Sequence, residues 1–242
     1  MREYETREII RIADNNVSAI DEPIVAETCV ALKLNGAEAT RFFCTPSSLE
    51  HLATGWLRSK GIITCTTDVE ALSVDLDSKI IVATVDKTSC AEEYCSSEEM
   101  KIPASQIELI FRAFNASSEL FHKTGGAHSC AVLPMEGLRE FDGRFPVIFE
   151  DVGRHNAVLK AIGSALTSGI FPNSAILLFS GRLALEIVDT AAALRFPVVL
   201  SAGAPTLAAV DSANKNGVTL AGFIKPGKIN VYTHPHRIDY AV

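Results

Sequence analysis

Short apolar runs alternate with segments of helical pattern after Gly126, and this alternation constrains the fold more than any other feature of the chain. A short apolar run is typical of a buried strand, whereas apolar residues that recur every three to four positions are typical of a helix packed on a sheet. Strands and helices that alternate in this way build α/β domains. We therefore predict an α/β domain with a mixed, largely parallel sheet over residues 103–242. The predicted strands cover residues 129–133, 146–149, 175–179, 198–200, 219–224 and 229–232, and the predicted helices cover about 154–168, 182–195 and 205–215.

The first part of the chain has the pattern of a small β-rich domain, which we place at residues 1–102. Apolar side chains alternate over residues 30–34, Asn35-Gly36 supplies the pair with positive φ that a tight hairpin needs, and residues 37–43 return as the second strand. A second pair of strands is predicted at residues 72–76 and 79–85. Between the two pairs, Thr45 as N-cap and Pro46 at the first helical position predict a helix that ends at Gly61.

Residues 86–102 are polar and acidic and show no periodicity, which predicts a long mobile loop at the end of the first domain. This loop holds Cys90 and Cys95, two of the six cysteines. A thiolate is the nucleophile of sulfur chemistry and can carry a sulfane sulfur as a persulfide. Alternatively, both thiols are inert, because the four glutamates of the loop oppose formation of a thiolate. Cys29, Cys44 and Cys65 lie in or next to apolar runs and are predicted to be small core residues.

Charge and apolar content exclude several classes of protein. The chain has 22 basic and 29 acidic residues, a formal net charge of −7, so we expect no binding to nucleic acid. No apolar run approaches the length of a membrane span, and the charged first fifteen residues do not resemble a secretory signal. We therefore expect no membrane association and a cytoplasmic location, where the cysteines remain thiols.

Three predicted strand-to-helix junctions carry glycine next to polar or basic residues. The carboxyl ends of parallel strands meet at one edge of a sheet, so these junctions should converge beside helix N-termini. Such an edge suits an anion, because free N–H groups point at it and arginine can hold a phosphate through two hydrogen bonds. Alternatively, the glycines only form tight turns and the arginines pair with surface acids. The candidate residues are Asp151, Gly153, Arg154, His155 and Asn156 in the first junction, Ser180, Gly181 and Arg182 in the second, and Pro205 and Thr206 in the third.

A further candidate site precedes the first strand of the α/β domain. Gly125 and Gly126 are followed by His128 and Cys130, which share one face of a strand because they are two residues apart. The alternative is a core cysteine and a hydrogen-bonded histidine. A zinc deaminase requires His-x-Glu and a Cys-x-x-Cys pair, and the chain has neither, so we expect no resident metal.

In these residues the chain resembles the formate dehydrogenase accessory sulfurtransferase family over nearly its whole length. The runs appear together and in the family's order, which makes the match specific. They are Val25-Ala26-Glu27, Leu34-Asn35-Gly36, Cys44-Thr45-Pro46, Gly61-Ile62-Ile63, Thr124-Gly125-Gly126-Ala127-His128, Glu150-Asp151-Val152-Gly153-Arg154-His155-Asn156-Ala157, Ser180-Gly181-Arg182, Ala204-Pro205-Thr206, Gly222-Phe223 and Asn230-Val231-Tyr232-Thr233.

The resemblance implies a cytoplasmic homodimer whose C-terminal domain has a cytidine deaminase-like fold without the deaminase zinc. It implies sulfurtransferase activity: sulfur passes from a cysteine desulfurase, as a persulfide, to the bis-guanylyl molybdopterin cofactor that the formate dehydrogenase catalytic subunit requires. The edge residues above, with Gly125, Gly126 and His128, would bind that cofactor. The alternative function is a chaperone that binds the molybdenum cofactor without transferring sulfur.

The chain departs from the family pattern in its cysteine loop. The family has Cys-Gly-x-Cys-Gly, whereas four residues separate Cys90 from Cys95 and no glycine flanks either. By order in the chain, we assign Cys90 as the persulfide carrier and Cys95 as the alternate or resolving thiol.

Overall fold

A six-stranded mixed sheet forms the centre of the molecule in the computed structural model, which describes residues 2–86, 101–145 and 147–240. The predicted α/β fold class is confirmed. In spatial order the sheet runs β13-β12-β11-β10-β8-β9. Its strands are β8 (His128–Pro134), β9 (Phe149–Asp151), β10 (Ala175–Phe179), β11 (Val198–Ser201), β12 (Thr219–Lys225) and β13 (Lys228–Thr233).

Strand directions determine which loops meet. β10 pairs in parallel with β11, and β11 with β12, whereas β8 runs antiparallel to both β10 and β9. β9, β10, β11 and β12 therefore all end at the same edge, which we call the carboxyl edge, and β8 begins there. The prediction that three strand-to-helix junctions converge is correct.

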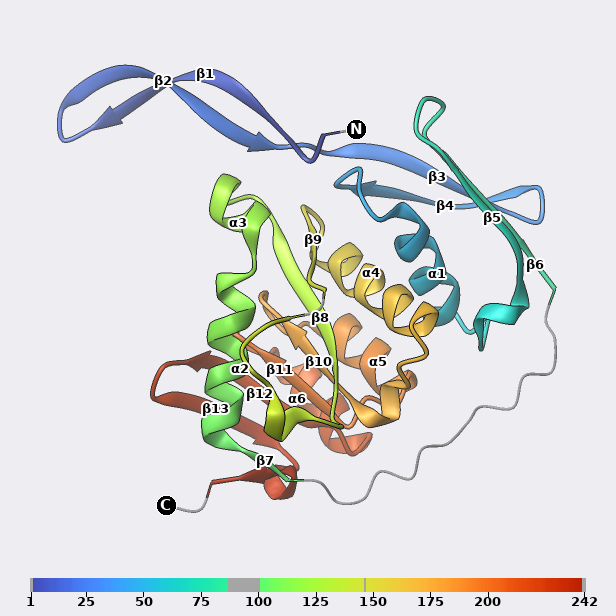
Figure 1. Cartoon of the computed structure of the whole chain (residues 1–242), viewed down its shortest axis with the longest axis vertical. Helices are drawn as coiled ribbons and strands as arrows, with labels where there is room; N and C mark the ends of the chain where they lie inside the picture. Colours follow the sequence, from blue (N-terminus) through green and yellow to red (C-terminus); the bar gives the residue numbers. More distant parts are fainter. Residues whose placement is uncertain (1, 87–100, 146, 241–242) are drawn as a thin grey trace.

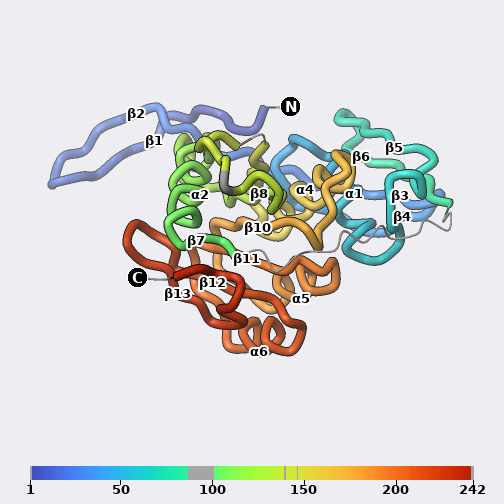
Figure 2. The backbone as a smooth tube through the Cα atoms, turned by 60° about the horizontal axis from the view of Figure 1, so that its bottom comes forward, coloured from blue at the N-terminus to red at the C-terminus, as the bar shows by residue number. Residues whose placement is uncertain are grey.

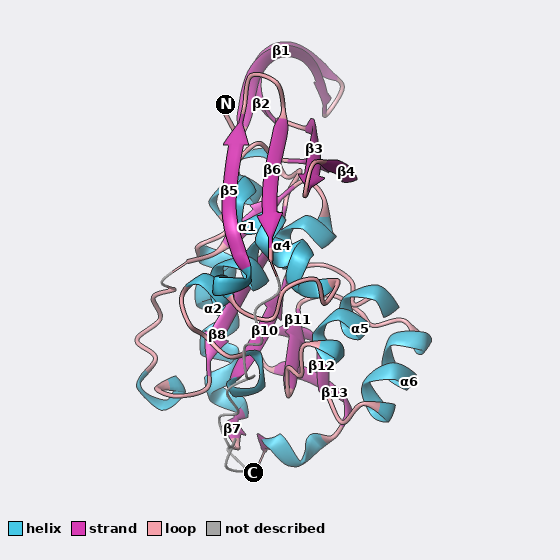
Figure 3. Cartoon of the chain, turned by 90° about the vertical axis from the view of Figure 1, so that its right-hand side faces the viewer, coloured by secondary structure: helices cyan, strands magenta, loops and turns pink. Residues whose placement is uncertain are grey.

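Helices cover both faces of this sheet (Figure 3). α2 (Ala104–Ala116) packs on one face, and α4 (Arg154–Thr167), α5 (Leu185–Ala193) and α6 (Leu207–Lys215) pack on the other. All five residues of β10 are buried, because this central strand lies between the two helix layers. In the described ranges, no helix has the length and apolar character needed to cross a membrane. The short elements are α3 (Glu119–Thr124), β7 (Ile102–Pro103), β14 (Ile238–Asp239) and the 3₁₀ turns η1 (Thr66–Asp68), η2 (Leu138–Glu140), η3 (Pro172–Ser174) and η4 (Pro235–Arg237).

The N-terminal part contains a four-stranded sheet in the order β4-β3-β6-β5, with α1 (Leu49–Ser59) packed against it. The strands are β3 (Thr28–Leu34), β4 (Ala37–Cys44), β5 (Val69–Asp75) and β6 (Ile80–Val85). Both predicted strand pairs are confirmed. Asn35 and Gly36 have φ of 48° and 86°, the left-handed pair that a two-residue hairpin turn requires.

The helix start predicted at Thr45 and Pro46 is wrong, because α1 begins at Leu49. Thr45 is fully buried and its polar groups have partners outside the helix. Its N–H donates to Asp151 Oδ2 at 3.2 Å, and its hydroxyl accepts from Val152 N at 3.0 Å. Because the N–H and hydroxyl groups of Thr45 make these tertiary hydrogen bonds, they do not cap the helix.

The predicted strand at residues 146–149 is shifted: β9 covers Phe149–Asp151, and residue 146 lies outside the described part. The polar residues Glu150 and Asp151 extend into the strand because both carboxylates have partners. Glu150 accepts from the N–H groups of Leu120 and Phe121 at 2.8 and 2.9 Å.

Residues 4–25, for which no individual element is predicted, form a long hairpin of β1 (Tyr4–Ala13) and β2 (Asn16–Val25). The two strands pair along all ten positions, and the arm extends away from the body (Figures 1 and 2). Asp14 and Asn15 form the turn in left-handed conformations. Asp and Asn tolerate this region better than other residues with side chains, which makes Asp-Asn a turn signal.

α1 and α4 lie side by side and join the N-terminal part to the α/β part (Figure 1). Glycines allow the close approach: a Cβ atom at Gly55 would lie 1.8 Å from the carbonyl oxygen of Leu159, and one at Gly163 would lie 2.0 Å from that of His51. The domain boundary predicted near residue 102 falls beside residues 87–100, which the structure does not describe.

The close helix contact predicts the effect of Gly55→Ala. Alanine is favoured over glycine inside a helix by about 1 kcal/mol, so helix propensity alone predicts stabilisation. The added methyl group instead collides with the backbone of α4, and we expect a net loss of about 1–3 kcal/mol in the free energy of unfolding. Urea denaturation measures this change. An unchanged or higher midpoint would contradict the close packing of α1 against α4.

Candidate functional site

The loops at the carboxyl edge pack backbone against backbone. A Cβ atom at Gly203 would lie 2.4 Å from the oxygen of Gly181, and one at Gly222 would lie 2.7 Å from the oxygen of Gly203. Ser201 Oγ joins the first two loops, because it donates to Gly181 O at 2.6 Å and accepts from Gly203 N at 3.0 Å. The loops after β10 and β11 and the Gly222 segment of β12 therefore form one continuous surface.

Basic side chains gather beside this surface. Arg154 is the first residue of α4, Arg182 follows β10, and His128 begins β8, the strand between β9 and β10. Burial lowers the pKa of His128, and the positive charges of Arg154 and Arg182 lower it further. The Asp151 carboxylate opposes this shift, and the net effect favours the neutral form of His128 beside the two arginines.

Neither arginine has an acidic partner at ion-pair distance among the described residues. Arg154 Nε is buried and makes no hydrogen bond there, and Arg182 is exposed. Surface arginines that only balanced nearby acids would be paired, as Arg41 is with Glu38 at 2.7 Å. The two guanidinium groups are thus available to an anionic ligand.

His155, the second residue of α4, contacts a carboxylate that sequence reasoning missed. Its Nε2 lies 2.7 Å from Glu186 Oε2 at the start of α5. Burial lowers the pKa of His155, the Glu186 carboxylate opposes this shift, and Arg154 adds to it. No local pattern marks Glu186, because the contact joins the N-termini of two helices that are separate in the sequence.

Asp151 and Lys160 form a fully buried ion pair at 2.6 Å, with both side chains 0% exposed. Burial raises the pKa of Asp151, whereas Lys160 and several hydrogen bonds oppose that shift. Lys160 also donates to Thr45 O at 3.2 Å. Asp151 was predicted to contact a ligand, but its carboxylate is enclosed by the protein and instead fixes the junction from which Arg154 extends.

Three other predicted residues are also held by internal hydrogen bonds. Gly153 N donates to Asp151 Oδ1 at 2.7 Å, and Asn156 Nδ2 donates to Phe43 O at 2.7 Å. Ser180 Oγ accepts from Ser129 N at 2.8 Å. These contacts position the edge loops.

The remaining predicted residues lie next to helices and strands that border the carboxyl edge. Gly125 ends α3 in a left-handed conformation, and Gly126 packs so closely on the arm that a Cβ atom would lie 2.6 Å from Val25 Cγ1. Pro205 pairs with Leu183 in an isolated bridge, and Thr206 caps α6 by accepting from Ala209 N at 3.2 Å.

Two of the described thiols are unsuited to act as nucleophiles. Cys44 and Cys130 are buried, and burial raises the pKa of Cys44 to about 12 and raises that of Cys130 as well. Cys29, Cys44 and Cys65 were predicted to be core residues. Cys44 is buried, as predicted, whereas Cys29 and Cys65 are only half-buried. Cys90 and Cys95 lie outside the described residues. Within those residues, no group of three or more His, Cys, Asp or Glu side chains is placed to hold a metal ion.

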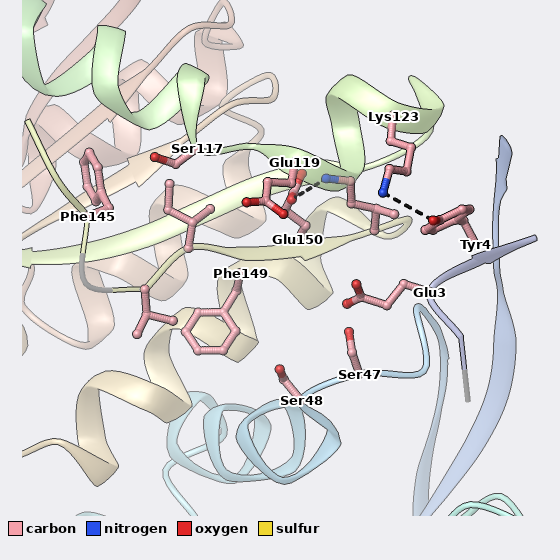
Figure 4. Close-up of a pocket in the computed structure, with 13 residues that line it drawn as sticks. Glu3, Tyr4, Ser47, Ser48, Ser117, Glu119, Lys123, Phe145, Phe149 and Glu150 are labelled. Carbon is pink, nitrogen blue, oxygen red and sulfur yellow. Dashed lines mark hydrogen bonds between the residues drawn. The ribbon is translucent and has the colours of Figure 1, made fainter.

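A separate pocket of about 480 Å³ lies beside β9 and is lined in part by Phe149 and Glu150 of that strand (Figure 4). Glu3, Glu119 and Glu150 line it together with Lys123, whose ammonium donates to the Tyr4 hydroxyl at 3.2 Å. None of the predicted site residues that the structure describes lines this pocket. Its excess of carboxylates makes it unsuitable for an anion, so the candidate site is the carboxyl edge.

Removing Lys160 tests whether the buried Asp151–Lys160 ion pair stabilises the fold. We expect Lys160→Met to lower the free energy of unfolding by about 3–5 kcal/mol, because the Asp151 carboxylate is left buried without its counterion. Lys215→Met, at an exposed position near the end of α6, is the matched control and should change stability by no more than about 0.5 kcal/mol. Equal urea midpoints for the two variants would contradict this role.

Known proteins align with this chain over almost its full length. The sulfur carrier protein FdhD of Bacillus subtilis is 29% identical over 96% of each chain, and that of Shouchella clausii is 30% identical over 97% of this chain and 96% of its own. The crystal structure of a proposed formate dehydrogenase accessory protein from Desulfotalea psychrophila superimposes with a TM-score of 0.83 at 26% identity, covering 98% of this chain and 100% of the other. Residues 25–97 and 83–239 match the model of the FdhD/NarQ family. The resemblance inferred from the sequence is thereby confirmed, and this chain belongs to the FdhD/NarQ family.

Proposed function

We propose that this protein is a sulfur carrier that accepts persulfide sulfur from a cysteine desulfurase and transfers it to the bis-guanylyl molybdopterin cofactor of formate dehydrogenase. The relatives named sulfur carrier protein support the general role. The grouping of Arg154, Arg182 and His128 at the carboxyl edge is the observation that carries the ligand assignment. An edge with two guanidinium groups that have no acidic partner among the described residues suits the phosphates of a guanylyl cofactor.

In this proposal, Cys90 and Cys95 of the cysteine loop carry out the sulfur transfer. The Cys90 thiolate attacks the outer sulfur of the desulfurase persulfide, so a new S–S bond forms on Cys90 and the desulfurase leaves as a thiolate. Transfer to the cofactor as sulfide requires two electrons. The Cys95 thiolate supplies them when it attacks the inner sulfur, which releases sulfide and closes a Cys90–Cys95 disulfide. External thiols then reduce this disulfide.

The partners follow from these two steps. A cysteine desulfurase donates sulfur, and the formate dehydrogenase catalytic subunit receives the sulfurated cofactor. The resemblance also implies a cytoplasmic homodimer, so each partner would meet two copies of the carboxyl edge.

Intact mass spectrometry tests sulfur loading. After incubation with a cysteine desulfurase and cysteine, we expect the wild-type protein to gain the mass of one sulfur atom, because a persulfide adds one sulfur to the thiol. Cys90→Ala should abolish the gain, Cys95→Ala should retain it, and the control Cys65→Ala should behave as wild type. Loss of the adduct in Cys95→Ala alone would reverse the two roles. A wild-type protein without any adduct would contradict sulfur transfer and favour the cofactor-binding chaperone.

Calorimetric titration with GDP tests the ligand edge. Arg154→Ala and Arg182→Ala should each weaken GDP binding by about 1–3 kcal/mol, because each removes a charge-assisted hydrogen bond to phosphate. Arg41→Ala, at an arginine paired with Glu38 in the N-terminal sheet, is the control and should bind GDP normally. Wild-type affinity in both edge variants would show that these arginines do not contact the ligand.

A further inference from the structure

The arm formed by β1 and β2 presents an apolar face near its turn that nothing in the described part of the chain covers. Directly opposite residues of an antiparallel pair point to the same side, so Ile10 and Ile12 share one face with Ala19 and Val17. Ile10, Ile12 and Val17 are 63%, 74% and 69% exposed, because this end of the arm extends away from the body (Figures 1 and 2). An isolated two-stranded ribbon is at best marginally stable in water. A surface that covers this face would therefore stabilise the arm.

The same face of the arm carries two carboxylates without a counterion. Glu8 and Asp21 lie directly opposite each other, and neither forms an ion pair with a described residue. Like charges at directly opposite positions destabilise a sheet. On the other face the charges are paired, since Arg11 lies 2.8 Å from Glu22. The surface that covers the apolar face should therefore combine apolar side chains with positive charge.

The outer face of the N-terminal sheet has this composition. Phe43, Lys33 and Val82 each follow a residue of the core against α1 in their strands, so the alternation of side chains points them away from α1. Phe43 and Val82 are exposed. Lys33 lies directly opposite Val82 and has no ion-pair partner among the residues that the structure describes. This face is thus an apolar surface with an available cation.

We propose that the arm of one copy of this chain packs on the outer face of the N-terminal sheet of a second copy, and the reverse. The contact places the carboxylates Glu8 and Asp21 opposite Lys33. Because β2 ends at Val25 and β3 begins at Thr28, arm and sheet are adjacent, and one twofold axis can form both contacts in a closed dimer. A second copy is also present whenever the protein is, whereas a different partner would leave the apolar face exposed in its absence.

The area of the arm is sufficient for a stable dimer. Each strand of the arm has ten residues, so the arm is about 33 Å long and, at two strand spacings, about 10 Å wide. Burial of one face of both arms, together with the surfaces that they cover, removes about 1,300 Å² from water. Specific, stable interfaces bury roughly 1,200–2,000 Å². The inference rests on the proposed function only for the existence of a homodimer, to which it assigns the interface.

Sedimentation equilibrium of the full chain tests the contact. We expect a dimer at micromolar concentration. Ile10→Ser combined with Ile12→Ser should raise the dissociation constant of the dimer about 100-fold or more, because two isoleucine side chains leave each of the two contacts. Circular dichroism should be unchanged, since both positions are exposed. Leu207→Ser, at an exposed leucine that begins α6, is the matched control and should leave the dimer intact.

Charge reversal identifies which surfaces meet. Glu8→Lys and Lys33→Glu should each raise the dissociation constant about 10-fold, because each places like charges together in the interface. The combined variant restores opposite charges and should return to within about threefold of wild type. A monomeric wild type, or a dimer unaffected by the isoleucine changes, would overturn the inference. Additive weakening in the combined variant would overturn it as well, because Glu8 would then not face Lys33. Sulfur loading of the same variants, measured by intact mass, tests the proposed function separately.

Discussion

The buried ion pair between Asp151 and Lys160 is the interaction on which the rest of the structure depends. Charges are tolerated in a dry interior only when each has a counterion and hydrogen bonds. This pair obtains them from both parts of the chain: Thr45 contributes a backbone N–H and a carbonyl oxygen, and the β9–α4 junction contributes the N–H of Gly153. The pair therefore fixes the N-terminal sheet against the α/β sheet and sets the position of α4, whose first residue is Arg154.

The charge at the carboxyl edge is positive, whereas the net charge of the whole molecule is negative. The chain carries a formal net charge of −7, yet Arg154 and Arg182 lie together beside a histidine whose pKa their charges lower. Net charge governs bulk behaviour such as avoidance of polyanions, whereas a binding site responds to groups within a few ångströms. A small anionic ligand is thus compatible with an acidic protein, and the cluster of carboxylates beyond β9 keeps the neighbouring pocket chemically distinct (Figure 4).

Prediction from the sequence succeeded where the signal is local. The Asn35-Gly36 hairpin, the buried strand β10 and the convergence of three junctions depend on turn chemistry, apolar runs and topology rules, and the structure has all of them. It failed where a polar side chain has a distant partner. Thr45 did not cap a helix because Asp151 and Val152 bind it, and Asp151 was expected to face a ligand but is fully buried. Glu186 and Lys160 were missed for the same reason, although a lysine among the apolar residues of a helix is a signal for a buried pair.

The sequence by itself determined the order of strands and helices after Gly126, the residue types at each junction and the family to which the chain belongs. Only the tertiary structure decided which of the polar junction residues bind the protein itself and which remain free for a ligand. The hydrogen bonds that make this division join residues far apart in the sequence, such as Thr45 and Asp151 at a separation of 106 positions. Periodicity and turn propensity report on neighbours within a few residues, whereas the desolvation and pairing of a polar group depend on every atom that folding brings beside it.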